Sequence, residues 1–392
     1  MTATIDVPNS VFEQAIATRR DVHRHPELGF SEHRTSAIVA ERLRRLGIDV
    51  HEGIAKTGVV GVLRGSQAGR TIMLRADMDA LPMPEENDHD YRSAVDGVAH
   101  ACGHDGHVAI LLGAAAVLSE RRNDLAGTIA FFFQPAEEGG GGARLMIEEG
   151  ALERFGVERA YGLHLTSYLP LGITAFRSGP MLASSDEIDV TVQGRGGHAS
   201  LPHMSVDPIL TASSVVVALQ HVVSRQTDPV EPAVVSVCSL HAGTTYNVIP
   251  SEATLRGTIR TFNEAVRAEM PERIRRVIAG TCEANGATFS LDLKPGFPVT
   301  VNDAAQAAYA RELIAKLLGE QRVITSPQVM GSEDFSYFAQ AVPSCFYFVG
   351  SMSSERTAYP NHHGKFDIDE QALLTGIRTT VALALDAPLH AP

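Results

Sequence analysis

The stretch HACGHDGH at residues 100–107 places one cysteine and three histidines close together. Cys102 and His104 are one residue apart, so on an extended or turning segment both side chains can reach a single point. A divalent cation there would keep the thiol ionised, and thiolate and imidazole are ligands that zinc-like metals prefer. The apolar run AILLGAAAVL follows at 109–118, so we expect these residues just before a helix. The spacing predicts part of a metal site whose other ligands are distant in the chain.

Further side chains with metal-binding chemistry stand where elements end. RTIMLRA (70–76), GTIAFFFQ (127–134) and YGLHL (161–165) are typical of buried strands, and we expect the first to lie beside a strand at 57–63. Polar residues at the carboxyl ends of such strands lie where open α/β sheets place their sites. A single buried histidine is more often a core residue, but so many ligand types together favour a metal site. The residues collected in this way are Asp77, Asp79, Glu137, Glu138, His164, His362 and His363.

The order of the apolar patterns predicts two domains. At 392 residues the chain exceeds what one hydrophobic core usually organises. Strands and helices alternate over 1–183 and again over 299–392, which is typical of an α/β domain with a mixed sheet flanked by helices. Residues 184–298 follow the order β-α-β-β-α-β, the ferredoxin-like arrangement. We therefore expect one discontinuous domain that carries the metal site and one inserted domain.

Composition and charge disfavour several classes of protein. Apolar residues make up 44% of the chain and charged residues 20%, which is typical of a soluble globular protein. The net charge of -13 and the lack of basic blocks disfavour nucleic acid and anionic membranes as partners. No apolar run is long enough to span a membrane, and the first residues lack a signal pattern. Cysteines without paired spacing fit a reducing compartment, so we expect a cytoplasmic protein.

Taken in order, the motifs resemble those of the M20 metallopeptidases. Within that family they resemble the amidohydrolases that cleave N-acyl amino acids, which include hippurate hydrolases and auxin-conjugate hydrolases. The resemblance covers nearly the whole chain, and the series of motifs is far more specific than any one of them. The motifs are HRHPELGFSE, RADMDALPM, HACGHDGH, QPAEEGGGGA, GLH, GRGGHASLPH, VDPI, NVIP, GTIRTF, GSEDF and HHGKFDIDE.

The resemblance implies two divalent ions, Mn²⁺ or Zn²⁺, about 3.5 Å apart. The implied ligands are Cys102, His104, Glu138, His164 and His362. At the last position the family usually has a histidine followed by one residue and a proline. This chain has His362, His363 and Gly364 instead, so either adjacent histidine could be the ligand. Counting back from Phe366 favours His362.

The resemblance also implies roles for Glu137 and Asp79. Adjacent glutamates on a turn are expected to point in different directions, so that Glu138 binds metal while Glu137 takes a proton from the metal-activated water and passes it to the departing amine. A surface carboxylate beside a glycine loop is the alternative reading of Glu137, but its position after a buried strand favours the base. Asp79 matches the residue that orients a metal ligand in the family. A direct role for Asp77, where related peptidases carry a metal-binding histidine, stays open.

In the inserted domain, the resemblance implies that His198, Asn247 and Arg260 hold the substrate carboxylate and the developing oxyanion. Simple turn chemistry at Asn247 and a solvated strand position at Arg260 are the alternatives. The inserted domain would serve as a lid and as a dimerisation domain, with some of these groups reaching across a homodimer or higher homo-oligomer.

The sequence therefore predicts a metal-dependent amidohydrolase that acts on a small N-acyl amino acid, for example an N-acetyl or N-benzoyl derivative, and releases the free amino acid. A dipeptidase or carboxypeptidase on the same scaffold is the nearest alternative, because a peptide is also an N-acylated amino acid. A non-catalytic binding protein is a third reading. It is disfavoured because every expected ligand position is filled.

Overall fold

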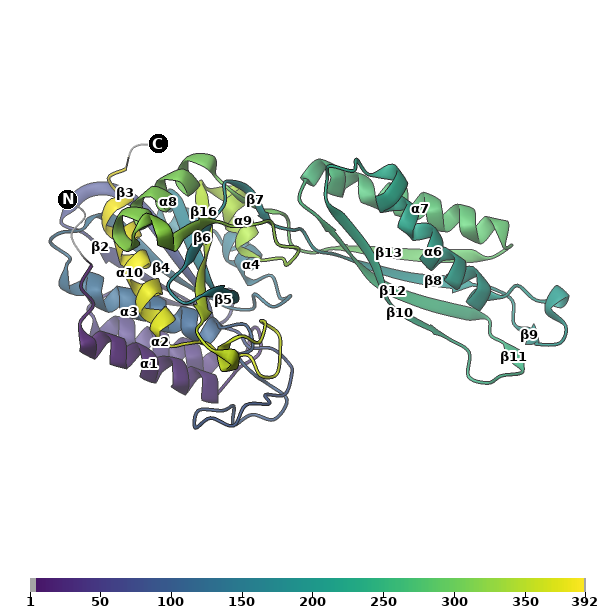
Figure 1. The fold of residues 1–392 in the computed structure, drawn as a ribbon, viewed down its shortest axis with the longest axis horizontal. Helices are drawn as coiled ribbons and strands as arrows, with labels where there is room; N and C mark the ends of the chain where they lie inside the picture. The colour runs from purple at the N-terminus through teal and green to yellow at the C-terminus, as the bar shows by residue number, and fades with distance from the viewer. Residues whose placement is uncertain (1–4, 391–392) are drawn as a thin grey trace. The chain divides into compact units, whose positions relative to one another are not determined.

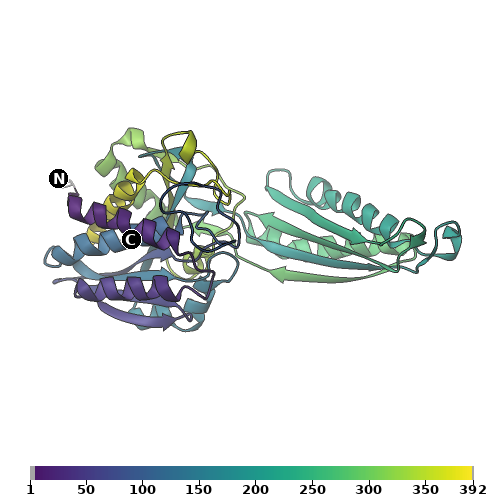
Figure 2. The same cartoon turned by 90° about the horizontal axis from the view of Figure 1, so that it is seen from below.

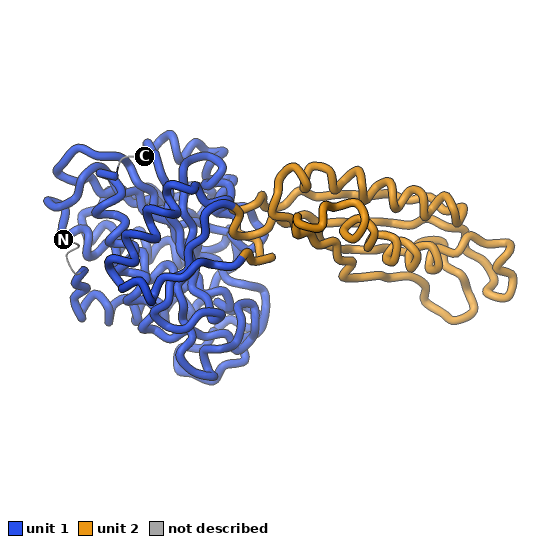
Figure 3. The backbone as a smooth tube through the Cα atoms, turned by 45° about the horizontal axis from the view of Figure 1, so that its top comes forward, with its two compact units in different colours: residues 1–179, 301–327, 334–392 blue, residues 180–300, 328–333 orange. Residues whose placement is uncertain are grey.

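The computed structural model describes residues 5–390, so the outermost residues of the expected first domain, 1–4 and 391–392, lie outside the described part. The chain divides into two compact units (Figure 3). Unit 1 comprises Met1–Gly179, Val301–Pro327 and Asp334–Pro392, and unit 2 comprises Pro180–Thr300 and Gln328–Glu333.

The segments 180–183, 299–300 and 328–333 belong to unit 2, whereas the sequence predicts them in the first domain; 328–333 is the one far from the predicted boundaries. Backbone hydrogen bonds explain this membership. The Ala183 N–H donates to the carbonyl oxygens of Val329 and Gly331, at 3.1 and 2.9 Å. These hydrogen bonds join residues that are far apart in sequence, so no local sequence pattern predicts them.

Unit 1 is built on a mixed sheet of eight strands in the order β1-β2-β4-β3-β5-β16-β6-β15 (Figure 1). β3 runs parallel to β4 and to β5, and β16 runs parallel to β5, while β2 is antiparallel to β4. The expected pairing of strand 57–63 with strand 70–76 is wrong, because β4 lies between β2 and β3. The strands are β1 (Asp49–Ile54), β2 (Gly58–Arg64), β3 (Gln67–Asp77), β4 (Ala126–Gln134), β5 (Arg159–Pro170), β6 (Thr174–Phe176), β15 (Val323–Thr325) and β16 (Ser344–Met352).

Helices cover both faces of this sheet, as three adjacent phenylalanines of β4 show. Phe131 and Phe133 belong to the main core cluster, whereas Phe132 packs edge-on against Phe155 and Phe338. Successive side chains of a strand point to opposite faces, so the helices that carry Phe155 and Phe338 lie on the face away from that core. The helices of unit 1 are α1 (Asn9–Arg24), α2 (His33–Arg45), α3 (His104–Glu120), α4 (Gly142–Glu148), α5 (Ala151–Phe155), α8 (Ala304–Leu318), α9 (Phe335–Ala341) and α10 (Gln371–Asp386).

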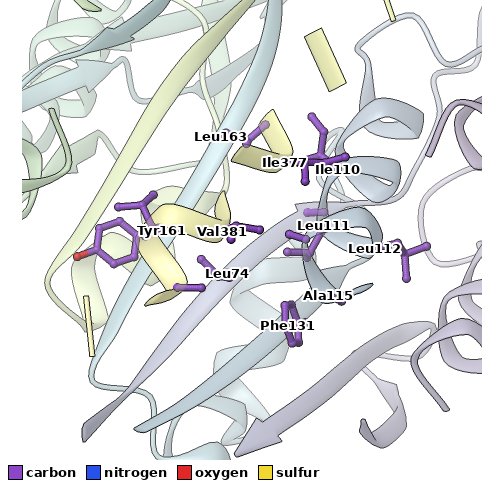
Figure 4. Packing of buried hydrophobic residues seen from close by; sticks show 14 of the residues in the cluster. Leu74, Ile110, Leu111, Leu112, Ala115, Phe131, Tyr161, Leu163, Ile377 and Val381 are labelled. Carbon is purple, nitrogen blue, oxygen red and sulfur yellow. The ribbon is translucent and has the colours of Figure 1, made fainter. Parts of the chain in front are cut away.

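Helix α3 lies at the centre of the core of unit 1. It packs beside α1 and α10 (Figures 1 and 2), and almost all of its side chains are buried. A helix that is apolar all round is expected in such a position. Leu111 of α3 lies in one cluster with Leu74, Phe131 and Ile377 (Figure 4). This packing holds the first residue of α3, His104, on a rigid element.

Unit 2 has the order β-α-β-β-α-β and an antiparallel sheet in the order β10-β12-β8-β13. Its helices and sheet enclose a core of their own, to which Val190, Leu219 and Ile274 belong. The elements are β8 (Asp186–Gln193), α6 (Pro208–Gln226), β10 (Ala233–Ala242), β12 (Glu252–Thr261), α7 (Glu264–Ala284) and β13 (Thr288–Pro295). Two short two-stranded sheets complete the fold: β9 (Gly197–His198) with β11 (Val248–Ile249), and β7 (Gly179–Leu182) with β14 (Thr300–Asn302). The predicted α/β fold class is confirmed. Among the described residues, no helix is long and apolar enough to cross a membrane.

Candidate metal centre

The candidate site lies at the carboxyl ends of neighbouring parallel strands in unit 1. Asp77 ends β3 and pairs in register with Gln134, the last residue of β4, so both strands stop at one edge of the sheet. His164 comes from β5. A long connection without helix or strand follows β3 and ends at His104, where α3 begins. Gly103 has a φ of 88°, a left-handed conformation that glycine adopts without strain.

Two groups of potential ligands share Cys102. Within each group, one ligand atom per residue lies within 4.8 Å of the others. The first group is Cys102, His104 and His164, and the second is Cys102, Glu138 and His362. Cys102 Sγ lies 3.4 Å from His164 Nε2, and Glu138 Oε1 lies 3.2 Å from His362 Nε2. The structure thus brings together all the side chains that the sequence predicts as metal ligands.

The hydrogen bonds of two histidines leave one nitrogen of each ring available to a cation. His104 donates from Nδ1 to the backbone oxygen of Asp79 at 2.8 Å, and His164 donates from Nδ1 to that of Leu165 at 2.7 Å. His104 Nε2 is buried without a hydrogen-bond partner among the described residues. Such an atom costs free energy unless it is satisfied. A divalent ion would satisfy it, and a thiolate, imidazoles and a carboxylate form a donor set that fits zinc and similar metals.

The protonation of the cluster also fits a cation site. Burial raises the pKa of the Cys102 thiol, and the neighbouring Glu138 carboxylate raises it further. Hydrogen bonds to Cys102 and Glu138 raise the pKa of His362 to about 10. Without a cation, the thiol and the imidazole therefore hold their protons at neutral pH. A divalent ion replaces these protons, since metal ligation needs a thiolate and a neutral imidazole.

A strained turn after β4 presents the two adjacent glutamates. Ala136 has a φ of 52°, and its N–H donates to Glu32 Oε1 at 2.8 Å. Both oxygens of Asp79 are used in the same turn: they accept the backbone N–H groups of Glu137 and Glu138, each at 2.9 Å. One oxygen of each glutamate lies within 4.8 Å of the other and of a His104 nitrogen, so both carboxylates lie at the cluster, and the division of roles between them stays a prediction. The turn and Asp79 together hold both carboxylates toward the cluster.

Asp77 is fully buried and belongs to a polar network that the sequence leaves open. Its carboxylate accepts from Arg75 at 2.6 Å and from His107 Nδ1 at 2.5 Å. Burial raises the pKa of Asp77, but Arg75, His104 and His107 outweigh it and hold the pKa well below its usual value. His107 Nε2 in turn accepts the Leu165 N–H at 2.9 Å. Asp77 Oδ2 is 3.6 Å from His104 Nε2, so its carboxylate lies beside the ring nitrogen that is available to a cation.

Arg75 and Asp334 are the residues of this region that sequence reasoning missed, whereas His107 was counted in the HACGHDGH motif without a role. Arg75 also donates to Asp334 Oδ1, at 3.0 Å. The available signal was an arginine within an otherwise apolar strand, RTIMLRA, because a buried guanidinium requires carboxylate partners.

His362 and His363 have different surroundings. The His362 N–H donates to the backbone oxygen of Ala101 at 2.7 Å, and its left-handed φ of 66° turns the ring to the Cys102 side. The preceding Asn361 donates from its side chain to the backbone oxygen of Cys102 at 3.1 Å. His363 is half-buried, stacks on Tyr359 and accepts a backbone N–H on its Nδ1. Of the two histidines, His362 is the one that lies with the other ligands.

The substrate-binding residues predicted in the inserted domain all lie in unit 2. The β9–β11 pair brings two of them together: His198 is in register with Val248, and the Ala199 N–H donates to the Asn247 backbone oxygen at 3.2 Å. Both side chains are exposed. Arg260 lies apart from them on β12, where it donates to Ser332 Oγ at 2.9 Å.

Residues 73–386 match the family described as peptidase family M20/M25/M40. The chain belongs to this family. Thermostable carboxypeptidase 2 of Saccharolobus solfataricus is 41% identical over 375 residues, covering 94% of each chain. N-acetylcysteine deacetylase of Bacillus subtilis is 39% identical over 371 residues, covering 94% of this chain and 96% of the relative. A crystal structure of a Bacillus subtilis protein, described as a dinuclear metal binding peptidase from the M20 family, is 35% identical with a TM-score of 0.85 and covers 98% of this chain and 99% of that chain.

The M20 resemblance predicted from the motifs is therefore confirmed, and this M20 chain is a hydrolase. The matched range contains every residue of both ligand groups, from Cys102 to His362. It also contains the whole of unit 2. Both units thus belong to the family's common architecture.

Proposed function

We propose that this M20 hydrolase cleaves the amide bond of N-acyl amino acids with two divalent ions, Mn²⁺ or Zn²⁺, bound by the two ligand groups. The observation that carries the proposal is that both groups include Cys102. A side chain common to two sites allows two cations to lie side by side. The 35% identical Bacillus subtilis protein is described as a dinuclear metal binding peptidase, which supports the number of ions.

Two cations bound there would polarise the amide carbonyl and lower the pKa of the attacking water. In this proposal Glu137 takes the proton of that water and delivers it to the nitrogen of the departing amino acid, which leaves as a neutral amine. The position of the Glu137 carboxylate supports this role. The Glu137 carboxylate is buried beside His104 and Glu138, and Glu137 Oε1 accepts the Asp334 N–H at 3.3 Å, which restricts its rotation. Asp79 acts through the turn, because it fixes the backbone of both glutamates.

The proposed substrate class rests on the relatives and on the chemistry of unit 2. One relative is named N-acetylcysteine deacetylase, which describes an N-acyl amino acid as its substrate. We propose that His198, Asn247 and Arg260 bind the substrate's carboxylate and the oxyanion that forms on the amide. Arg260 is half-buried, and burial lowers its pKa, yet a guanidinium remains charged at neutral pH and binds carboxylates in a bidentate manner.

The experiment that tests the proposal measures release of free amino acid from N-acetyl and N-benzoyl amino acids, with metal-stripped protein before and after addition of Mn²⁺ or Zn²⁺. We expect release only after metal addition. A panel in which neither ion restores release from any acylated amino acid would contradict the proposal, whereas activity that survives full metal removal would contradict the metal-dependent step alone.

One observation favours a second candidate, a carboxypeptidase or dipeptidase. A relative that is 41% identical is named a carboxypeptidase, and a peptide presents the same amide and the same terminal carboxylate. Including dipeptides and N-acylated dipeptides in the panel separates the two functions. A kcat/KM that is at least tenfold higher for peptides than for acetyl and benzoyl amino acids would favour the peptidase.

We propose further that the protein is a cytoplasmic homodimer. Leu210 and Val217 on α6 are 60% and 68% exposed, which supports a surface that a second copy covers. Light scattering after size exclusion is expected to give twice the chain mass, and Leu210→Glu with Val217→Glu is expected to halve it.

A further inference from the structure

A second cluster of metal-binding side chains lies in unit 1 and shares no residue with the ligand groups around Cys102. His23 is on the last turn of α1, while Glu85 and His89 are on the connection between β3 and α3. One ligand atom of each residue lies within 4.8 Å of the others. The three side chains are only 2%, 4% and 9% exposed. Neither the proposed hydrolysis nor its metal pair uses any of them.

The spacing of the three ligand atoms suits one small cation. Glu85 Oε1 lies 3.1 Å from His23 Nε2 and 3.2 Å from His89 Nε2. Around tetrahedral zinc, with bonds of about 2.0–2.1 Å to nitrogen and oxygen, neighbouring ligand atoms are about 3.3 Å apart. Two of the three separations match that edge within a few tenths of an ångström, and the third, between nitrogens of His23 and His89, is below 4.8 Å.

Neighbouring groups orient the three side chains as they do at built metal sites. His23 Nδ1 lies 2.9 Å from Asp105 Oδ2, which keeps the proton on Nδ1 and turns Nε2 toward Glu85. This carboxylate–histidine pair is the usual support of a ligating imidazole. The other oxygen of Glu85 accepts the Ser93 N–H at 2.7 Å. The ring of His89 is stacked on Tyr91 with 3.8 Å between centroids, which fixes its plane.

Two histidines of this region have buried ring nitrogens that lack well-aligned hydrogen bonds, although His89 Nε2 lies 3.2 Å from Glu85 Oε1. Among the described residues, neither nitrogen of His89 and neither nitrogen of His100 has a hydrogen bond of acceptable geometry. His100 is 1% exposed, and its ring centroid lies 6.3 Å from that of His23. Buried polar atoms normally find partners, so unpartnered imidazoles beside a carboxylate point to a missing ligand.

The charges of the cluster also favour a cation. Glu85 contacts His23 and His89, and Asp105 contacts His23 and the buried Arg19. A divalent cation at the three ligand atoms would lie beside these two carboxylates, which favours its binding.

We propose that His23, Glu85 and His89 bind a third divalent cation of the zinc class. Two imidazoles and one carboxylate supply three ligands and leave one position for water. The cation joins α1 to the connection that leads from β3 to the Cys102 and His104 pair, a segment with no helix or strand of its own. Its role is therefore to order that connection, and it takes no part in the hydrolytic step.

The test counts zinc bound to the full chain. Purified protein is stripped with a chelator, equilibrated with excess Zn²⁺, desalted, and analysed for zinc and protein by mass spectrometry and amino-acid analysis. We expect His89→Gln to hold one zinc fewer than the wild type. His25→Gln, a histidine close to His23 but 40% exposed and outside the cluster, is expected to equal the wild type. The zinc that remains in His89→Gln serves as an internal check that unit 1 is folded.

Equal zinc content in the wild type and in His89→Gln overturns the proposal. That result would mean that a proton occupies His23 Nε2 instead, since Asp105 and Glu85 outweigh burial and raise the pKa of His23 to about 9. Titration of stripped wild-type protein with Co²⁺ provides a second measurement that needs no variant. Ligand-field absorption that keeps growing after the thiolate-to-cobalt band of Cys102 has saturated supports the site, and simultaneous saturation of both overturns it.

Discussion

At Asp79 a single carboxylate supports the backbone of two neighbouring residues to which we assign roles in the proposed function. Each of its oxygens accepts one backbone N–H, from Glu137 and from Glu138. Asn in place of Asp79 keeps one acceptor and turns an NH₂ group against the other N–H. We expect Asp79→Asn to weaken metal binding by about 10–100-fold, the usual effect of losing a group that orients a ligand. Competition with a chelator of known affinity measures this, and Asp124→Asn, an exposed substitution, should leave the affinity unchanged.

Substitution of Glu137 is expected to affect turnover and not metal binding, because the proposed role of Glu137 is in proton transfer. We expect Glu137→Gln to lower kcat by about 10²–10⁴-fold, while the metal content stays that of the wild type. Steady-state kinetics and metal analysis on the same preparation measure the kcat and the metal content. Glu148→Gln, a similar change at a 58% exposed position, is the control. A Glu137→Gln enzyme with wild-type kcat would remove the proton-transfer role.

The candidate ligands were predictable at the residue scale, whereas their supports were not. The close spacing of Cys102 and His104 predicts them as ligands. Glu138 and His164 are predicted because they lie where apolar strands end. The pair of Asp77 with His107 gives no such signal, because it depends on side-chain directions across two elements. The placement of both Glu137 and Glu138 at the cluster depends on the left-handed backbone of Ala136, which is unusual for alanine and has no signal in the sequence.

At the scale of elements, a buried ion pair fastens α1 to the segment that leads into α10. Arg19 donates to Asp367 at 2.5 Å, and Tyr91 donates to the second oxygen of Asp367 at 3.1 Å. Burial raises the pKa of Asp367, but Arg19 outweighs it and lowers the pKa below its ordinary value. The pair therefore stabilises the fold above the unfolded-state pKa of about 3.9, and the contribution is lost as the pH falls through the lower, folded-state pKa.

We accordingly expect Asp367→Asn to lower the free energy of unfolding by about 1.5–3 kcal/mol, because Arg19 loses its bond to a charged carboxylate but keeps those to Asp105 and Glu370. The difference from the wild type should be constant from pH 7 to pH 5 and should narrow below about pH 4. Urea midpoints of both proteins across this range measure it. Asp96→Asn, at an exposed position, should give no difference. If the difference in the free energy of unfolding grows as the pH falls, the lowered pKa of Asp367 is contradicted.

Element types were easier to predict than element neighbours. The β-α-β-β-α-β order of unit 2 follows from the chain order of apolar patterns, because each of its elements has a clear period. The insertion of β4 between β2 and β3 is different, since strand order is decided by how the chain crosses the sheet. β1 escaped prediction as well: its sequence DVHEGI is mostly polar, and it lies at the edge of the sheet, where only one neighbour stabilises it.

At the scale of the whole molecule, each unit has its own hydrophobic core, and both ligand groups lie in unit 1. Metal that binds only the folded state stabilises it by about 2.7 kcal/mol at a free concentration of 100 times Kd. We therefore expect metal removal to lower the melting temperature of unit 1 and to leave that of unit 2 unchanged.

Buried thiols report on the two units separately. Cys345 is buried in unit 1 and Cys282 in unit 2. Pulsed alkylation along a temperature ramp, read by mass spectrometry, should show Cys345 labelled at a lower temperature after chelation and Cys282 at the same temperature. If chelation lowers the labelling temperature of both thiols equally, the two units unfold together.

The membership of Cys102 in both ligand groups has a redox consequence. Oxidation of this one sulfur to a sulfenic acid removes a ligand from two positions at once, so a single chemical event disables the whole centre. Peroxide should therefore release all catalytic metal and all activity at the same rate, with no half-loaded, half-active species, and parallel time courses of metal release and turnover would reveal this. Because Cys102 belongs to both ligand groups, oxidation of this single residue is expected to inactivate the hydrolase completely.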